Sequence, residues 1–321
     1  MHTMEMEYVI GVDAGGTKTV AFLAEPLGEA GYQLVGKGAA GAANMAQHRE
    51  ETVGQVICAA IESAFASADM APQPVSAACL AVAGAGRAPE RLRLLRWASE
   101  AKIAEHVQVV HDAEPVLYSA NPEGVGVALI AGTGSLAYGR DASGRDARCG
   151  GWGPLLGDEG SGYAIAVAGL RAAVRAADGR GPRTRLLAAF LEHLDCPAVS
   201  DLIAAIYDPS VTRTTIASLA RIVLREAEAG DSVADAIAEA SASDLAQMVG
   251  QVTRQLALED GAYHLALTGG VLIHDVPFRN RVLAQLDAAQ TRPLEVTPVP
   301  DPAAGAVTMA CRHWHRVHWR R

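Results

Sequence analysis

The segment YVIGVDAGGTKTVAFLA (8–24) decides the fold of this chain. Two apolar runs typical of strands flank a turn in which Asp13 is soon followed by two glycines, a threonine and a lysine. Glycines at the end of a buried strand let backbone N–H groups approach an anion closely, and hydroxyl side chains add donors. The segment is not a Walker loop, because Thr17 and Lys18 stand in the reverse order and a strand follows instead of a helix. The sequence therefore predicts a strand–turn–strand unit that binds an anion.

Two further apolar runs end in glycines beside a hydroxyl residue, GVALIAGTGSLAY (126–138) and HLALTGGV (264–271). The first of them matches the dinucleotide pattern Gly-x-Gly-x-x-Ala, but a strand follows where that pattern needs a helix. One such strand–glycine–strand turn could be a plain hairpin. Several glycine turns in one chain favour a nucleotide that is held from several sides.

The predicted elements follow one plan twice. The first half has three consecutive strands, a helix and then strands that alternate with helices. We expect its first helix over 47–69 and its strands at 8–13, 19–24, 32–38, 76–84 and 106–112. The plan restarts at residue 126 and includes a long helical block over 161–257. A turn-rich stretch at 121–124 separates the halves. We expect two α/β domains, residues 1–120 and 121–302.

Composition excludes several classes of function. The chain has 321 residues, half of them apolar, and a net charge of −9, which argues against nucleic acid as a partner because that binding needs clustered Lys and Arg. The first residues of the sequence do not show the basic segment followed by a long apolar segment that marks a signal peptide. No apolar run is long enough for a membrane span. The five cysteines are scattered without a Cys-x-x-Cys pair. We expect a cytoplasmic protein with reduced thiols, no zinc site and no membrane segment.

Two aspartates stand where ligands of open α/β sheets bind, at the carboxyl ends of predicted strands. Asp112 is either the N-cap of the following helix or a general base that accepts a proton from a sugar hydroxyl, a role worth about 10²- to 10⁴-fold in rate. Asp13 either initiates a turn or holds Mg²⁺ through water, which suits a hard cation that bridges phosphates. If the two halves face each other, these groups and the glycine turns form one cleft.

The segment CGGWGPLLGDEGSGYAIA (149–166) is the other dense motif. A glycine-rich loop with one large aromatic residue suits a sugar platform, in which Trp152 packs on the apolar face of a ring and Asp158 accepts hydrogen bonds from hydroxyls. The alternative is a loop in which Asp158 or Ser161 only caps the helix that follows.

Taken together, these motifs resemble the BadF/BadG/BcrA/BcrD-type ATPase family, and within it the N-acetylglucosamine kinases, nearly end to end. The resemblance rests on Asp13 with the turn after it, GAANM (41–45), AVAGAG (81–86), Asp112, AGTGS (131–135), GGWGPLLGDEGS (150–161) and TGGV (268–271). It implies the actin/sugar-kinase/Hsp70 fold, with two RNase-H-like domains around an ATP cleft. It also implies that a terminal helix within 303–321 returns to the first domain.

The resemblance assigns roles to individual residues. The first phosphate loop is Gly15, Gly16, Thr17 and Lys18, the second is Gly132, Thr133, Gly134 and Ser135, and the adenosine is bordered by Gly269 and Gly270. Asp112 matches the catalytic aspartate. The positions that match sugar contacts are Asn44, Gly151, Trp152 and Asp158.

We therefore expect an ATP- and Mg²⁺-dependent kinase that phosphorylates the 6-hydroxyl of an amino sugar. N-acetylglucosamine, glucosamine and N-acetylmuramic acid remain open as acceptors, and the helical block at 161–257 offers a face for a homodimer. One alternative is an ATPase activator of a radical acyl-CoA dehydratase or reductase, which needs paired cysteines for an iron–sulfur cluster, whereas Cys149 lies in the sugar loop and the other cysteines are scattered. Another is a non-catalytic sugar-sensing protein.

Overall fold

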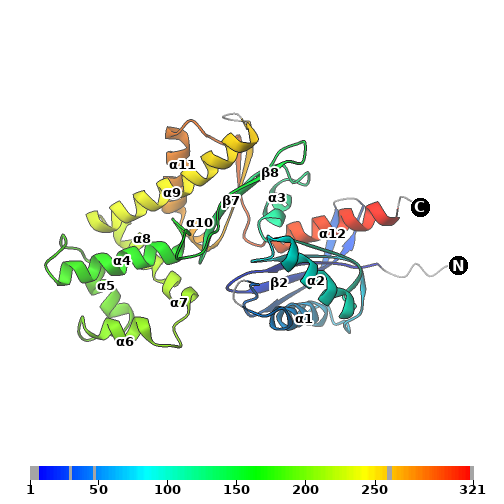
Figure 1. The fold of residues 1–321 in the computed structure, drawn as a ribbon, viewed down its shortest axis with the longest axis horizontal. Helices are drawn as coiled ribbons and strands as arrows, with labels where there is room; N and C mark the ends of the chain where they lie inside the picture. Colours follow the sequence, from blue (N-terminus) through cyan, green and yellow to red (C-terminus); the bar gives the residue numbers. More distant parts are fainter. Residues whose placement is uncertain (1–6, 29–30, 46–47, 259–261, 319–321) are drawn as a thin grey trace. The chain divides into compact units, whose positions relative to one another are not determined.

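The computed structural model describes residues 7–28, 31–45, 48–258 and 262–318 (Figure 1). The chain divides into two compact units, which we describe separately. Unit 1 comprises Met1–Val125 together with Asp301–Arg321, and unit 2 comprises Gly126–Pro300. The described residues include no helix that is both long and apolar enough to cross a membrane.

Unit 1 contains a five-stranded sheet, within the described residues, in the order β3-β2-β1-β4-β5. Its strands are β1 (Val9–Ala14), β2 (Thr19–Pro26), β3 (Tyr32–Ala40), β4 (Val75–Val82) and β5 (Ala104–His111). β1 pairs antiparallel with β2 and parallel with β4, so β1 lies at the centre. Its helices are α1 (Glu50–Ala66), α2 (Ala88–Glu100), α3 (Glu114–Ala120) and α12 (Ala303–His318). The predicted strands of this half are confirmed. The first helix, expected over 47–69, covers Glu50–Ala66, and residue 47 lies outside the described residues.

Alternate residues of β1 face two different hydrophobic cores, as the period of a strand requires. Ile10 belongs to the core that contains Ile57 of α1, whereas Val9 belongs to the core that contains Val307 of α12. Gly11 lies so close to α12 that a Cβ atom there would overlap the backbone of Ala303 to Val307. The terminal helix therefore packs on the first strand of the chain, and Figure 1 shows α12 (red) in unit 1 beside α3.

Unit 2 repeats the sheet plan of unit 1. Its five-stranded sheet, again counted among the described residues, has the order β10-β9-β6-β7-β8. The strands are β6 (Gly126–Ala131), β7 (Ser135–Arg140), β8 (Asp146–Gly150), β9 (His264–Thr268) and β10 (Glu295–Pro298). β6 pairs antiparallel with β7 and parallel with β9, as β1 does with β2 and β4. The prediction that both halves follow one plan is confirmed.

The predicted helical block over 161–257 is confirmed and consists of several helices. Its helices are α4 (Gly162–Ala177), α5 (Leu186–His193), α6 (Asp201–Tyr207), α7 (Arg213–Ser218), α8 (Ala220–Glu228) and α9 (Ser232–Leu256), and α10 (Gly270–His274) and α11 (Val276–Ala288) follow β9. Side-chain caps set several of the starts: Ser161 accepts the N–H of Ala164 at α4, and Thr212 accepts that of Thr215 at α7.

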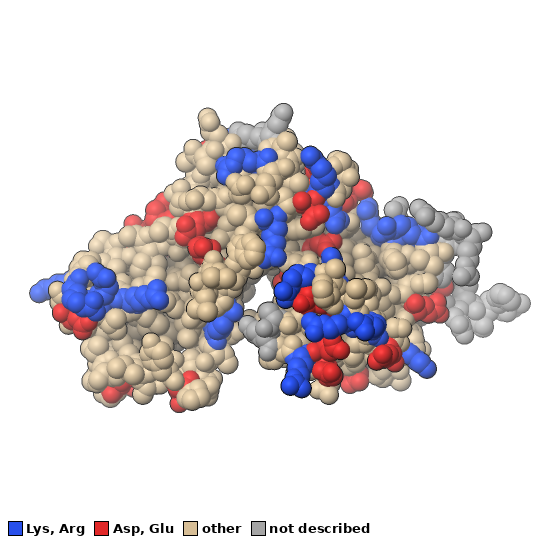
Figure 2. Space-filling model, in the orientation of Figure 1, with Lys and Arg blue, Asp and Glu red and all other residues tan. Residues whose placement is uncertain are grey.

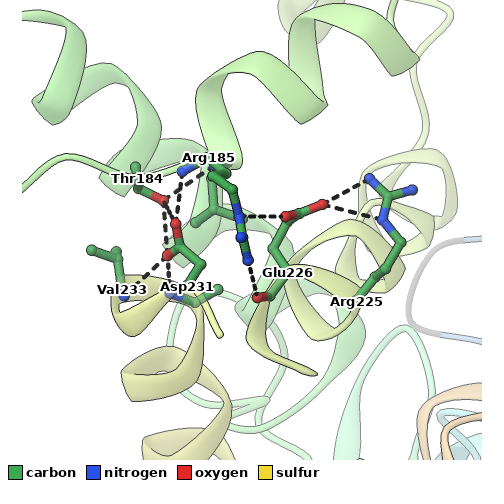
Figure 3. Close-up of polar contacts among 8 residues, drawn as sticks. Thr184, Arg185, Arg225, Glu226, Asp231 and Val233 are labelled. Atoms are coloured by element: carbon green, nitrogen blue, oxygen red, sulfur yellow. Dashed lines mark hydrogen bonds and ion pairs between the residues drawn. The ribbon is translucent and has the colours of Figure 1, made fainter. Parts of the chain in front are cut away.

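Asp231 fixes the start of the longest of these helices, α9. Its carboxylate accepts the N–H groups of Val233 (3.0 Å) and Ala234 (2.9 Å) within α9 and that of Arg185 (2.7 Å) just before α5. The hydroxyl of Thr184 donates to the same carboxylate (Figure 3). One buried side chain therefore joins the beginnings of two helices that lie 46 residues apart in sequence.

Figure 2 shows Lys and Arg side chains interspersed with Asp and Glu on the visible face of each unit. Around α2, Arg87 lies 2.8 Å from Glu90, and Arg93 lies 3.6 Å from Glu50 of α1. These basic side chains are thus matched by acidic neighbours.

Candidate functional site

The first glycine turn, between β1 and β2, is closed by its own backbone. The N–H of Gly15 donates to the carbonyl of Lys18 (2.9 Å), and the carbonyl of Gly15 accepts the N–H of Ala43 (2.9 Å). Asn44 follows, and its Nδ2 lies 3.7 Å from the position that a Cβ on Gly16 would take. Unit 1 therefore brings the first predicted phosphate loop and the predicted sugar-contacting Asn44 together.

Two other carboxylates and one lysine shift the pKa of Asp13 beside this turn. Asp13 retains some solvent exposure, but desolvation of its carboxyl raises its pKa to about 7. Asp112 and Asp301 also raise this pKa by charge repulsion, and Lys18 opposes them. Lys18 Nζ lies 3.8 Å from Asp301 Oδ1. A cation bound here would favour the charged form of Asp13.

Oxygen ligands of this kind fit Mg²⁺, which is a hard cation. Within the part of the chain that the structure describes, no three His, Cys, Asp or Glu side chains are arranged to hold a metal ion directly. Mg²⁺ usually keeps several waters and takes one or two carboxylates together with substrate phosphates. The donor set of unit 1 therefore fits Mg²⁺ held through water and phosphate, and does not fit a cage made only of protein side chains.

Asp112 lies directly after β5, and the structure tests one of the two roles considered for it, that of helix N-cap. Helix α3 begins at Glu114 with Ala113 at the N-cap, and no side chain caps it there. The interpretation of Asp112 as the N-cap residue is therefore wrong. Asp112 Oδ1 lies 2.9 Å from Nδ1 of His111, and the Asp112 side chain is 23% exposed. The same Nδ1 accepts the N–H of Ala113 (3.1 Å), and the Asp112 side chain keeps part of its surface open to solvent.

In unit 2 the second and third glycine turns lie side by side. Gly132 donates its N–H to the carbonyl of Gly134 (2.9 Å) and accepts the N–H of Gly162 (2.8 Å). A Cβ on Gly132 would lie 3.8 Å from the Cα of Gly269 and 3.9 Å from the N of Gly270. Gly269 has a φ of 93°, and a Cβ there would overlap the carbonyl of Ala131. Only glycine fits this close approach of β9 to the β6–β7 turn.

Asp158 contacts the second glycine turn. Its side chain is 6% exposed, and its Oδ1 accepts the N–H of Ser135 at 3.4 Å. The hydroxyl of Ser135 donates to the carbonyl of Glu159 (2.6 Å). A Cβ on Gly134 would lie 3.0 Å from both carboxylate oxygens of Asp158, so a larger residue there would require the carboxylate to shift. Ser161, and not Asp158, caps α4. Each carboxylate oxygen can accept more than one hydrogen bond, so the contacts with Ser135 and the ion pair do not use all of the acceptor sites of Asp158. The contact of Asp158 with sugar remains a prediction.

The loop from Gly150 to Gly157 presents Trp152 with 69% of its surface exposed. Arg148 stiffens the start of this loop: its Nε donates to the carbonyl of Gly150 (3.1 Å), its Nη2 donates to that of Gly151 (2.6 Å), and its guanidinium lies 5.5 Å from the centre of the Trp152 ring. An aromatic ring held by a stiff backbone and open to solvent is suited to pack on the face of a sugar.

Sequence reasoning missed Arg213, the first residue of α7. Its Nη2 donates to Asp158 Oδ2 at 3.0 Å, and its guanidinium lies 5.4 Å from the centre of the Tyr163 ring. The two partners of the ion pair lie 55 residues apart. A single arginine in a helical stretch carries no spacing signal, so only the folded chain identifies this pair.

Comparison with known proteins extends over nearly the whole chain. The model of the BadF/BadG/BcrA/BcrD ATPase family matches residues 10–310. An N-acetylmuramic acid/N-acetylglucosamine kinase of Clostridium acetobutylicum is 34% identical over 267 residues, which cover 83% of this chain and 86% of the relative. An N-acetyl-D-glucosamine kinase of Dictyostelium discoideum is 32% identical over 281 residues, with 83% and 86% covered. A solved structure from Chromobacterium violaceum, a proposed N-acetylglucosamine kinase, has a TM-score of 0.75 at 24% identity and covers 95% of this chain and 99% of its own.

Proposed function

We propose that this chain, which belongs to the BadF/BadG/BcrA/BcrD ATPase family, transfers the γ-phosphoryl group of ATP to the 6-hydroxyl of an amino sugar. The two relatives above 30% identity are amino-sugar kinases by name, which supports this class of acceptor. The observation that carries the proposal is the position of Asp112. Its partly exposed carboxylate directly follows β5, which lies at the edge of the described sheet of unit 1, and it is close enough to Asp13 to raise the pKa of that carboxyl. It does not serve as a helix cap.

In this reaction Asp112 acts as the general base. As the sugar oxygen bonds to the γ-phosphorus, its proton passes to the Asp112 carboxylate, and the bond from phosphorus to the β,γ-bridging oxygen breaks to release ADP. A base within reach of the hydroxyl contributes about 10²- to 10⁴-fold. Most of the remaining acceleration in phosphoryl transfer comes from positioning and charge stabilisation.

The turn that follows β1 supplies positive and hydrogen-bonding groups for the phosphates. Backbone N–H groups of Gly16 and Thr17 and the ammonium of Lys18 are the donors that we assign to them. Asp13 would hold Mg²⁺ through water, and bound Mg²⁺ supplies charge neutralisation on the transferred phosphoryl group. The ionised form of Asp13 is the one that serves this role.

Unit 2 supplies the remaining groups. The turn 132–135 and the adjacent Gly269 and Gly270 are assigned to the nucleotide, because their backbones approach each other without intervening side chains. The loop 150–158 is assigned to the sugar, with Trp152 against the ring face and Asp158 toward its hydroxyls. We also propose that the enzyme works in the cytoplasm, where ATP is available, and as a homodimer through the helical part of unit 2.

A substrate panel tests the proposal. The purified protein is incubated with ATP, Mg²⁺ and one sugar at a time, from N-acetylglucosamine, glucosamine, N-acetylmuramic acid and glucose, and both ADP and sugar phosphate are measured. We expect ADP and a 6-phosphate in equal amounts with an N-acetylated sugar. ADP formation that is independent of every sugar, or no ADP at all, would contradict a kinase of this class.

The iron–sulfur activator is less well supported by the positions of the thiols. The cysteines are free, and three of them, Cys79, Cys196 and Cys311, are buried. A cluster shared between two subunits needs thiolates that are presented together at the surface. Measurement of iron and sulfide in anaerobically purified protein decides this point, because stoichiometric amounts of both would favour the activator.

A further inference from the structure

Arg213 connects the elements of unit 2 to which the proposed function assigns separate ligands. It begins α7, pairs with Asp158 of the sugar loop at 3.0 Å and packs over the ring of Tyr163 in α4. Through Asp158 Oδ1 the same network reaches the N–H of Ser135 in the second glycine turn. The guanidinium of Arg213 thus contacts the sugar loop directly and reaches the phosphate turn through one residue, Asp158.

The pair differs from the exposed ion pairs elsewhere in unit 2. Only 6% of the Asp158 side chain and 33% of the Arg213 side chain are exposed, whereas Arg225, which pairs with Glu226 on α8, is 64% exposed. Exposed pairs contribute little, but a buried carboxylate that loses its partner is strongly disfavoured. Asp158 also has a φ of 62°, an uncommon value for a residue other than glycine. The position of this carboxylate therefore depends on Arg213.

The far end of α7 is also close to the glycine turn. A Cβ on Gly162 would lie 3.1 Å from the carbonyl oxygens of both Ala217 and Gly132. Helix α7 thus contacts the sugar loop at its first residue and approaches the second glycine turn near its last. A displacement of α7 or of the sugar loop would therefore move the N–H groups of the second glycine turn.

We propose that Arg213 is a positioning residue that couples sugar binding to nucleotide binding within unit 2. The inference rests on the proposed function, in which the loop 150–158 holds the sugar and the turn 132–135 holds phosphate. When sugar orders the loop, the Arg213–Asp158 pair fixes the amide of Ser135 in the position that suits the nucleotide. Each ligand then strengthens the binding of the other by the same factor, as linkage requires.

Titration calorimetry measures this factor. The dissociation constant of N-acetylglucosamine is determined with and without a saturating non-hydrolysable ATP analogue and Mg²⁺, and the ratio of the two constants is the coupling. For the wild type we expect a ratio of at least about 5, the lower end of typical coupling. Arg213→Gln should reduce it to about 1, within twofold. The control Arg225→Gln removes an exposed ion pair on the next helix and should leave the ratio unchanged.

A role in stability alone would lower the melting temperature of Arg213→Gln and leave its coupling ratio equal to that of the wild type, and this result would overturn the inference. Arg213→Lys keeps the charge but not the planar fork of donors, so it should give an intermediate ratio. If Arg213→Gln does not fold, a ratio in Arg213→Lys equal to that of the wild type would overturn the inference. A wild-type protein that binds nucleotide and no amino sugar would overturn the proposed function, and the inference with it.

Discussion

Replacement of Asp112 by asparagine separates catalysis from folding. Asn has the shape of Asp but does not accept a proton at neutral pH, so the general base is lost. We expect kcat to fall by about 10²- to 10⁴-fold, which corresponds to about 2.7–5.4 kcal/mol of transition-state stabilisation. Stability should change little, because Ala113 and not Asp112 is the N-cap of α3 and the side chain is 23% exposed. A loss of up to about 1 kcal/mol from the contact with His111 would lower the melting temperature by about 2–4 °C.

The same substitution has a second, electrostatic effect. Asp112 is the largest charged contribution to the raised pKa of Asp13, so its removal should bring this pKa down from about 7 toward its ordinary value. Steady-state kinetics with saturating ATP and sugar measure the change in kcat, and a thermal melt measures the change in stability. Glu105→Gln, an exposed change on the same strand, is the matched control and should leave kcat unchanged. A folded Asp112→Asn enzyme with a kcat within about threefold of the wild type would refute the reasoning.

Three further changes probe other parts of the structure. Trp152→Ala should raise the KM for sugar about tenfold and leave that for ATP unchanged, because a loss of about 1.4 kcal/mol of ring packing is a factor of ten; equal effects on both would show that the loop does not hold sugar. Asp231→Ala should lower the free energy of unfolding by about 2–4 kcal/mol, since a helix cap is lost and the N–H of Arg185 is left without its acceptor; a chemical denaturation curve that coincides with the wild type would contradict this. Gly305→Ala should destabilise the protein by about 1–3 kcal/mol or more, because the Cβ would overlap the carbonyl of Pro115, and an unchanged melting temperature would show that α12 can shift at no cost.

Asp231 also predicts how stability depends on pH. Burial tends to raise its pKa, but hydrogen bonds from Ala234, Arg185, Thr184 and Val233 outweigh burial and hold the pKa below its ordinary value. A carboxyl with a lowered pKa contributes stability above the pKa of the unfolded chain and loses it as pH falls through the folded value. We therefore expect the difference in stability between the wild type and Asp231→Ala to be constant near neutral pH and to shrink below about pH 4. A difference that grows on acidification would contradict the hydrogen-bonding account.

The strands and the glycine turns were predictable because both leave local signals. An apolar run that ends in glycines marks the end of a buried strand, and the two sheets place these turns as expected. The position of Asp112 after β5 followed from the same reasoning. The helical block was predictable only as a block, because Ala-rich sequence has a high helix propensity throughout and the breaks depend on caps such as Asp231.

The long-range partners were not predictable from one sequence. Asp158 pairs with Arg213 across 55 residues, and Asp301 approaches Lys18 only because the chain returns to unit 1. Neither pair has a characteristic spacing, and the hydrogen bond to Ser135 depends on the left-handed backbone of Asp158. The assignment of Asp158 to sugar came from the composition of its loop and from the resemblance, whereas its contact with the phosphate turn comes from the fold.

The packing of α12 on β1 has a consequence for the order in which the protein is made. The ribosome releases β1 well before α12, so the face of the sheet around Val9 and Gly11 stays uncovered until α12 has been synthesised. Unit 2 is continuous in sequence and can close its core while the terminal helix is still in the exit tunnel. An apolar sheet face of the nascent chain therefore stays without its own helix until α12 has been synthesised. We expect chains truncated before α12 to depend on chaperones, while the central unit folds on its own.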